Sequence, residues 1–257
     1  MRMHPFLEFG GPLAFAHRGG AAEAPENTMR AFARAISLGY LYLETDVYAS
    51  ADGVVLAFHD DRLDRLTGAK GTLASVNYAA IAPIRVNGAE PIPKLADILA
   101  AWPEARLNID PKSDDVVRPL IKLLREMNCL ERVCVGSFSG KRLKALRTEF
   151  GTQLCTSLGP SEVTRLKLFG RGLGAIQFDG QCAQVPTTWP VLGMQMCVVD
   201  SGFVEACHAH NLQVHVWTID DRAEMEALLD LGVDGLMTDR PAVLKEVLED
   251  RAQWCSP

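Results

Sequence analysis

Short apolar runs alternate with amphipathic stretches along most of the chain. Runs typical of β-strands lie near residues 13, 41, 106, 133, 153, 175, 213 and 234. Apolar residues recur at helical spacing over 114–127, 139–149, 161–169, 201–210, 221–230 and 241–250. Eight strands, each followed by a helix or its equivalent, predict a (β/α)8 TIM barrel whose functional residues lie at the carboxyl ends of the strands. A doubly wound open sheet is the alternative, but no GxGxxG motif follows the first strand.

The second strand, predicted over residues 40–47, alternates apolar and polar side chains. Glu44 and Asp46 fall on one face, opposite the apolar positions. An Asp-Gly pair at 52–53 is a strong hairpin signal, so residues 54–58 should return antiparallel to this strand. The returning arm would carry His59 back to the mouth of the barrel.

Residues 61–93 interrupt the regular pattern. The segment contains several glycines and prolines and at most one short helix, near 75–81. Long irregular connections tend to be functional, so we interpret it as an elaborated loop or small insertion after the hairpin. The chain, residues 1–257, is then a single domain in which a helix over 95–102 and a strand over 106–112 resume the alternation.

Composition excludes several classes of protein. A hydrophobic content of 48% with 23% charged residues is typical of a globular protein, and a net charge of -6 without any basic run argues against nucleic-acid binding. No apolar run reaches the ~18 residues of a membrane span, and the first twenty residues lack a signal-peptide core. The seven cysteines form no CxxC pair, and Cys134, Cys155 and Cys197 sit in apolar runs. We expect buried, reduced thiols in a cytoplasmic protein; the oligomeric state is not indicated.

Three carboxylates are predicted to meet at the barrel mouth. Glu44, Asp46 and Asp110 each lie near the end of a strand, on the face opposite the apolar one. Clustered carboxylates repel strongly in a cavity unless a cation neutralises them. All-oxygen ligation favours one divalent cation, Mg²⁺ or Ca²⁺.

Two histidines and two cations flank this predicted metal site. His17 and His59 are the candidate acid and base, since imidazole changes charge near neutral pH. Arg18 offers a planar fork and Lys112 a point charge, and both suit a phosphate ligand. The residues therefore predict metal-assisted cleavage of a phosphate ester, in which the two histidines exchange a proton.

An ordered set of motifs makes this prediction more specific. The motifs are His17-Arg18-Gly19, Pro25-Glu26-Asn27-Thr28, Glu44-Thr45-Asp46, Asp52-Gly53, His59-Asp60, Asp110-Pro111-Lys112, Ser137-Phe138, Val216-Trp217-Thr218, Gly232-Val233-Asp234-Gly235 and Thr238-Asp239. In order and spacing, from about residue 13 to 245, they resemble the glycerophosphodiester phosphodiesterase family. The resemblance implies a TIM barrel of the phospholipase-C-like type that hydrolyses glycerophosphodiesters to sn-glycerol 3-phosphate and an alcohol. The segment 61–93 matches the insertion that distinguishes this family from phosphatidylinositol-specific phospholipase C relatives.

The resemblance also implies roles for individual residues. His17 and His59 match the acid/base pair, Glu44 and Asp46 two metal ligands, and Arg18 and Lys112 the cations beside the phosphate. The family usually has Glu-Ile-Lys where this chain has Asp-Pro-Lys at 110–112, so the third ligand is one methylene shorter.

Four further positions carry weaker expectations. Similarity to the family places Trp217 against the glycerol or headgroup, and by alternation His215 lies one layer deeper in the barrel. Thr238 or Asp239 is predicted to cap the last helix. Asp60 is predicted to be a solvated turn residue.

Two alternative functions remain open at this point. The chain could cleave lysophospholipids as a lysophospholipase D does, a hypothesis motivated by Leu63, Leu66, Leu73, Val76 and Ile81 in the insertion. It could instead bind phosphorylated ligands without turnover, as the shortened Asp110 would allow.

Overall fold

Eight parallel strands with helices around them form a nearly closed barrel. The computed structural model describes residues 3–170, 177–191 and 193–255. The barrel strands are β1 (Leu13–Ala16), β2 (Tyr42–Ala49), β6 (Arg106–Pro111), β7 (Val133–Val135), β8 (Cys155–Thr156), β9 (Cys182–Val185), β12 (Gln213–Val216) and β13 (Gly235–Thr238). They pair in the order β8-β7-β6-β2-β1-β13-β12-β9. A single parallel bridge between Ser157 and Cys182 joins the two ends, which confirms the TIM barrel.

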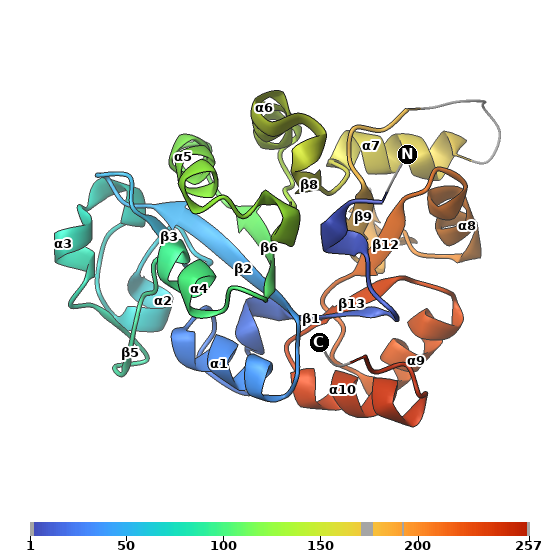
Figure 1. The fold of residues 1–257 in the computed structure, drawn as a ribbon, viewed down its shortest axis with the longest axis horizontal. Helices are drawn as coiled ribbons and strands as arrows, with labels where there is room; N and C mark the ends of the chain where they lie inside the picture. The colour runs from blue at the N-terminus through green and yellow to red at the C-terminus, as the bar shows by residue number, and fades with distance from the viewer. Residues whose placement is uncertain (1–2, 171–176, 192, 256–257) are drawn as a thin grey trace.

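The helices surround this ring (Figure 1). They are α1 (Met29–Ser37), α4 (Leu95–Ala101), α5 (Val117–Met127), α6 (Gly140–Phe150), α7 (Pro160–Phe169), α8 (Ser201–Ala209), α9 (Arg222–Asp230) and α10 (Pro241–Asp250). Side-chain oxygens cap several of them: Thr28 Oγ1, for example, accepts a hydrogen bond from Ala31 N–H at the start of α1. The outward faces of the strands and the inward faces of the helices form the main hydrophobic core.

The interior of the barrel has an apolar base and a polar mouth. Phe6 in the short 3₁₀ helix η1 (Pro5–Leu7) packs on Phe15 and Tyr42, with ring centroids 6.3 and 5.3 Å apart. These rings close the amino-terminal end of the barrel. Because side chains alternate along a strand, Tyr42, Glu44 and Asp46 point inward in successive layers while their neighbours join the outer core. The inward face predicted for β2 is therefore confirmed.

The sixth barrel strand differs from its predicted position. We expected it over 175–179; residues 175 and 176 lie outside the described residues, and 177–179 form no strand. The strand is β9 (Cys182–Val185), which begins seven residues after the predicted start. The two-stranded hairpin of β10 (Thr188–Val191) and β11 (Met194–Cys197), which follows β9, was not predicted.

The predicted hairpin is confirmed, but the insertion is more ordered than expected. β3 (Val55–Ala57) runs antiparallel to β2. Residues 61–93 contain two short helices and a small hairpin rather than one helix: α2 (Asp64–Thr67), α3 (Tyr78–Ile81), β4 (Arg85–Val86) and β5 (Glu90–Pro91). Side chains from this segment, among them Leu63, Leu73 and Ile81, form a small core with Leu56 and Phe58. Within the described ranges, no helix is long and apolar enough to cross a membrane.

Candidate active site

One cavity lies at the carboxyl ends of the barrel strands. It has a volume of about 590 Å³. All eight site residues predicted from the sequence line it: His17, Arg18, Glu44, Asp46, His59, Asp110, Lys112 and Trp217. These side chains come from strands far apart in the chain, so barrel closure brings them together.

Both histidines are held by a carboxylate at the same ring nitrogen. His17 Nδ1 lies 2.6 Å from Asp239 Oδ1, and His59 Nδ1 lies 2.7 Å from Asp60 Oδ1. A carboxylate at Nδ1 fixes the ring and directs Nε2 toward proton transfer; Nε2 of His17 lies 3.8 Å from Glu44 Oε2. Burial lowers the pKa of His17, but the nearby charges of Glu44 and Asp239 outweigh that effect, so the pKa is raised.

The roles predicted for Asp239 and Asp60 were wrong. Arg240 occupies the N-cap of α10, and Glu23 Oε1 accepts from the first-turn N–H of Ala242 at 3.0 Å; Asp239 pairs with His17 instead. Asp60 bonds to His59 and is held in turn by Arg65 of the insertion, with Asp60 Oδ2 2.5 Å from Arg65 Nε. The pairing of Asp60 with His59 could have been inferred because the two residues are adjacent in the sequence. The pairing of Asp239 with His17 could not, because these residues lie at opposite ends of the chain.

Arg65 connects the insertion to residues that line the cavity. It donates to Glu26 at 2.7 and 3.0 Å, and the same carboxylate accepts from Arg18 Nη1 at 3.1 Å. The hydrogen bond from Arg65 is the main cause of the lowered pKa of Asp60. Arg65 is thus linked to Arg18 through Glu26 and to His59 through Asp60. The sequence analysis did not identify Arg65.

The backbone around Arg18 explains the glycines after it. Arg18 has a φ of 52°, and Gly19 and Gly20 also have positive φ. A Cβ at Gly19 would lie 2.7 Å from Ala31 Cβ. This tight turn aims the Arg18 N–H at Glu44, where it donates to Oε2 at 3.0 Å.

Glu44 and Asp46 are buried side by side in different electrostatic surroundings. Glu44 is 4% exposed and Asp46 2%. Burial, followed by repulsion from Asp46, raises the pKa of Glu44 to about 7. Burial also acts to raise the pKa of Asp46, but Lys112 and Arg18 lower it by more. Of the two carboxyl groups, Asp46 is therefore the one that stays ionised more readily.

Lys112 bridges two of the three predicted metal ligands. Its Nζ lies 3.1 Å from Asp46 Oδ1 and 3.1 Å from Asp110 Oδ2. The register of β2 and β6 pairs Asp46 directly with Asp110, which explains their approach. Burial raises the pKa of Asp110 in spite of Lys112. Arg18 Nε and Asn27 Nδ2 hold the other Asp46 oxygen, at 3.0 and 3.2 Å.

The donor set fits a hard divalent cation. Glu44, Asp46 and Asp110 offer carboxylate oxygens to one cavity, and burial raises the pKa values of Glu44 and Asp110. A bound cation would share Asp46 with Lys112 and Arg18, which already contact both of its oxygens.

The opposite side of the cavity is apolar. Trp217 packs edge-to-face on Phe138 with ring centroids 5.4 Å apart, and Phe138 also contacts Trp189 on β10. Phe138, Trp189 and Met196 line the cavity and are 54%, 37% and 47% exposed. His215, one layer below Trp217, is completely buried, as alternation predicted.

Comparison with known proteins agrees with this geometry. Residues 17–243 match the glycerophosphoryl diester phosphodiesterase family. A probable glycerophosphodiester phosphodiesterase 2 from Mycobacterium tuberculosis is 35% identical over 256 residues, which cover 97% of this chain and 95% of the relative. Lysophospholipase D GDPD1 of Rattus norvegicus is 26% identical, covering 91% of this chain and 85% of the relative.

Solved structures share the fold. A putative glycerophosphoryl diester phosphodiesterase from Silicibacter pomeroyi has a TM-score of 0.78 at 24% identity, with 97% of this chain and 98% of that chain covered. An Oleispira antarctica phosphodiesterase in complex with the product sn-glycerol-3-phosphate has a TM-score of 0.75 at 20% identity, covering 93% and 97%. Because the family match spans most of the chain, this protein belongs to the glycerophosphoryl diester phosphodiesterase family.

Proposed function

We propose that this enzyme hydrolyses glycerophosphodiesters to sn-glycerol 3-phosphate and an alcohol. The observation that carries the proposal is the pair of histidines, each held at Nδ1 by a carboxylate, on the same cavity as Glu44 and Asp46. One group to remove a proton and one to supply it are what cleavage of a phosphate ester requires. The product bound to the Oleispira antarctica neighbour supports the same substrate class.

The two histidines divide the proton transfers between them. One imidazole Nε2 takes a proton from the attacking oxygen, either water or the glycerol hydroxyl, and that oxygen bonds to phosphorus. Attack by the hydroxyl would form a cyclic phosphate, which water would then open to sn-glycerol 3-phosphate. The other imidazolium gives its proton to the departing alkoxide as the phosphorus–oxygen bond breaks. Asp239 and Asp60 stabilise the imidazolium that each step forms or consumes. Arg18 and Lys112 lie where they can offset charge on the phosphate oxygens.

A divalent cation completes the proposed site. Glu44, Asp46 and Asp110 would hold it, and their hard oxygens favour Mg²⁺ or Ca²⁺. When bound, it supplies positive charge to the phosphate oxygens. The family resemblance places Trp217 against the glycerol or headgroup, and its position on the cavity wall supports that role.

Turnover of glycerophosphocholine tests the proposal. His17→Ala and His59→Ala should each lower kcat by about 10²–10⁴-fold, while His210→Ala, which removes an imidazole remote from the cavity, should retain activity. Activity should disappear with a chelator and return with Mg²⁺ or Ca²⁺. Wild-type turnover in both histidine variants would overturn the assignment, and a protein inactive with every metal and diester would instead favour the non-catalytic binding function.

Lysophospholipid cleavage is a second candidate, supported by the apolar wall of the cavity. The insertion does not provide this surface, because Leu63, Leu73 and Ile81 are buried in its own core. The exposed Phe138 and Trp189 do, and they lie at the mouth, where an acyl chain would leave the site.

Comparing kcat/KM on lysophosphatidylcholine and glycerophosphocholine separates the two substrates. If the lipid is used, Trp189→Ala should reduce only its turnover. A strong preference for the deacylated diester rejects the lipid function.

We also propose a cytoplasmic location. All seven cysteines are free, which suits a reducing compartment. The expectation that all are buried was wrong: Cys197 is exposed and Cys255 partly so.

A further inference from the structure

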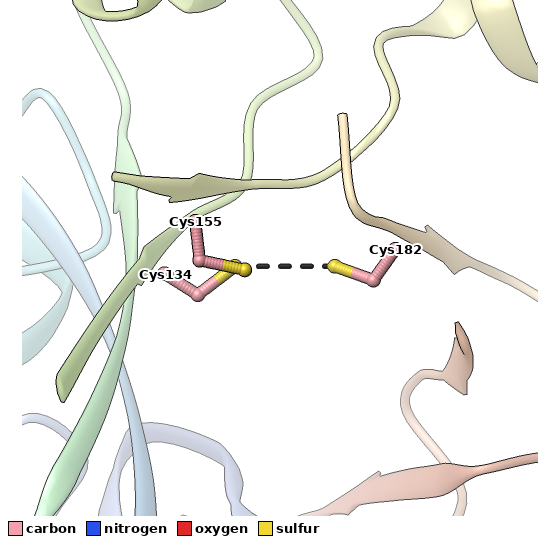
Figure 2. A group of neighbouring side chains, drawn as sticks. All are labelled: Cys134, Cys155 and Cys182. Atoms are coloured by element: carbon pink, nitrogen blue, oxygen red, sulfur yellow. Dashed lines mark hydrogen bonds between the residues drawn. The ribbon is translucent and has the colours of Figure 1, made fainter. Parts of the chain in front are cut away.

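Three cysteine side chains meet inside the barrel, below the active-site layer. Cys134, Cys155 and Cys182 lie on β7, β8 and β9, and each is completely buried. Their Sγ atoms all lie within 4.8 Å of one another, and those of Cys134 and Cys182 are 3.9 Å apart. Figure 2 shows the thiols of Cys134 and Cys155 directed toward that of Cys182. Among the described residues, no other group of three or more His, Cys, Asp or Glu side chains brings its ligand atoms this close together.

The cluster spans the seam where the barrel is least well paired. β8 has only two residues, and the sheet path ends there and at β9. Across the seam, Leu158 N–H donates to Cys182 O at 2.7 Å and Gln181 N–H to Thr156 O at 2.8 Å. An ion held by Cys155 and Cys182 would therefore cross-link the two strands that the ladder joins by a single bridge.

His215 lies beside Cys182, and each of its ring nitrogens contacts a glutamine side chain. Gln213 Nε2 donates to Leu7 O at 3.1 Å, so Gln213 Oε1 faces His215 Nε2 at 3.1 Å and must accept its proton. His215 Nδ1 is then unprotonated, and its contact with Gln184 Nε2 is a long 3.4 Å. Metal-binding histidines are oriented in the same way, with the second nitrogen donating to an oxygen.

A cationic side chain lies near the cluster. At the base of the barrel, Arg106 donates to the hydroxyl of Tyr42, which packs in the same interior cluster as the thiols. A guanidinium so placed would offset residual negative charge.

We propose that Cys134, Cys155 and Cys182 form a buried site for a thiophilic divalent cation of the zinc type, and that His215, whose nitrogens lie outside the converging set, moves closer to serve as the fourth donor. A zinc–sulfur distance of about 2.3 Å in a tetrahedral site requires sulfur atoms about 3.8 Å apart, close to the separation observed between Cys134 and Cys182. Binding converts three thiols to thiolates and releases three protons, which leaves a complex of net charge -1. The ion would fasten β7, β8 and β9 together beneath the cavity, and it is separate from the cation proposed for the carboxylates.

Refolding the full chain under reducing conditions with Zn²⁺ tests the site, because a completely buried ion must enter before the barrel closes. After gel filtration with EDTA, which strips the carboxylate site, about one equivalent of zinc should remain by elemental analysis. Refolding with Co²⁺ should give the intense thiolate-to-cobalt charge-transfer absorption, which carboxylate ligands do not produce. The zinc-loaded protein should also melt at a higher temperature than the protein refolded with EDTA.

Matched variants assign the ligands. Cys182→Ala and Cys155→Ala should lose the retained zinc and the cobalt band, whereas Cys129→Ala, which removes another buried thiol outside the cluster, should keep both. Wild-type protein that retains no zinc after refolding, shows no charge-transfer band and melts at the same temperature with or without zinc would overturn the proposal. So would a disulfide among the three thiols in the folded protein. Glycerophosphodiester turnover does not enter these measurements, so the proposed activity and the thiol site can fail independently.

Discussion

Glu44 should destabilise the metal-free protein at neutral and alkaline pH. Its pKa is raised from 4.5 to about 7 by burial and by Asp46. Between these values the native protein keeps a proton that the unfolded chain has released, so the free energy of unfolding falls as pH rises through this window. At about 1.4 kcal/mol per pH unit, the raised pKa of Glu44 lowers the free energy of unfolding by about 3 kcal/mol at pH 8 and by about 1 kcal/mol at pH 5.

Replacing this carboxylate with an amide tests the magnitude. Glu44→Gln keeps an oxygen that can accept the hydrogen bond from Arg18 N–H but cannot carry the charge. Relative to wild type, the variant's free energy of unfolding should therefore rise by about 2 kcal/mol from pH 5 to pH 8, in urea unfolding with EDTA present. Glu126→Gln, on the exposed face of α5, is the control and should have the same small effect at both pH values. An effect of Glu44→Gln that does not change with pH would refute the reasoning.

Three further substitutions test separate parts of the structure. Asp239→Asn should lower kcat by about 10²-fold or more and shift the limb of the pH–rate profile that reports His17 to lower pH; an unchanged profile would contradict the pairing. Lys112→Met removes the cation shared by Asp46 and Asp110 and should lower the free energy of unfolding, measured in urea, by about 2 kcal/mol. A variant as stable as wild type would argue against the bridge. Leu73→Ala should lower the free energy of unfolding by about 2–4 kcal/mol, because it opens a cavity in the insertion core, and should speed limited proteolysis within 61–93. Cleavage at the wild-type rate would show that this core does not hold the segment.

The local chemistry of the strands was predictable because it depends on a two-residue period. Alternation alone placed Glu44 and Asp46 inside the barrel, and the register of β2 with β6 then brought Asp110 beside Asp46. The Asp-Gly turn likewise fixed the antiparallel return that carries His59.

The partners of the histidines depended on tertiary contacts instead. Asp239 reaches His17 only because β13 pairs with β1, which closes the barrel between the ends of the chain. The core of the insertion was missed for a related reason: Leu63 and Leu73 have no helical or strand period between them, and only the packed segment shows that they meet. Composition alone suggested a loop.

The barrel strands are paired unevenly. β2 carries Glu44 and Asp46, β6 carries Asp110, and these two strands pair over six successive residues. Such a frame can hold buried, mutually repelling carboxylates at fixed positions, which a looser segment would relieve by moving them into water. The opposite half, with two-residue β8 and a single bridge to β9, carries the apolar wall that faces the substrate. If the thiols inside this half bind a metal ion, the ion would hold β8 to β9, as backbone pairing holds β2 to β6.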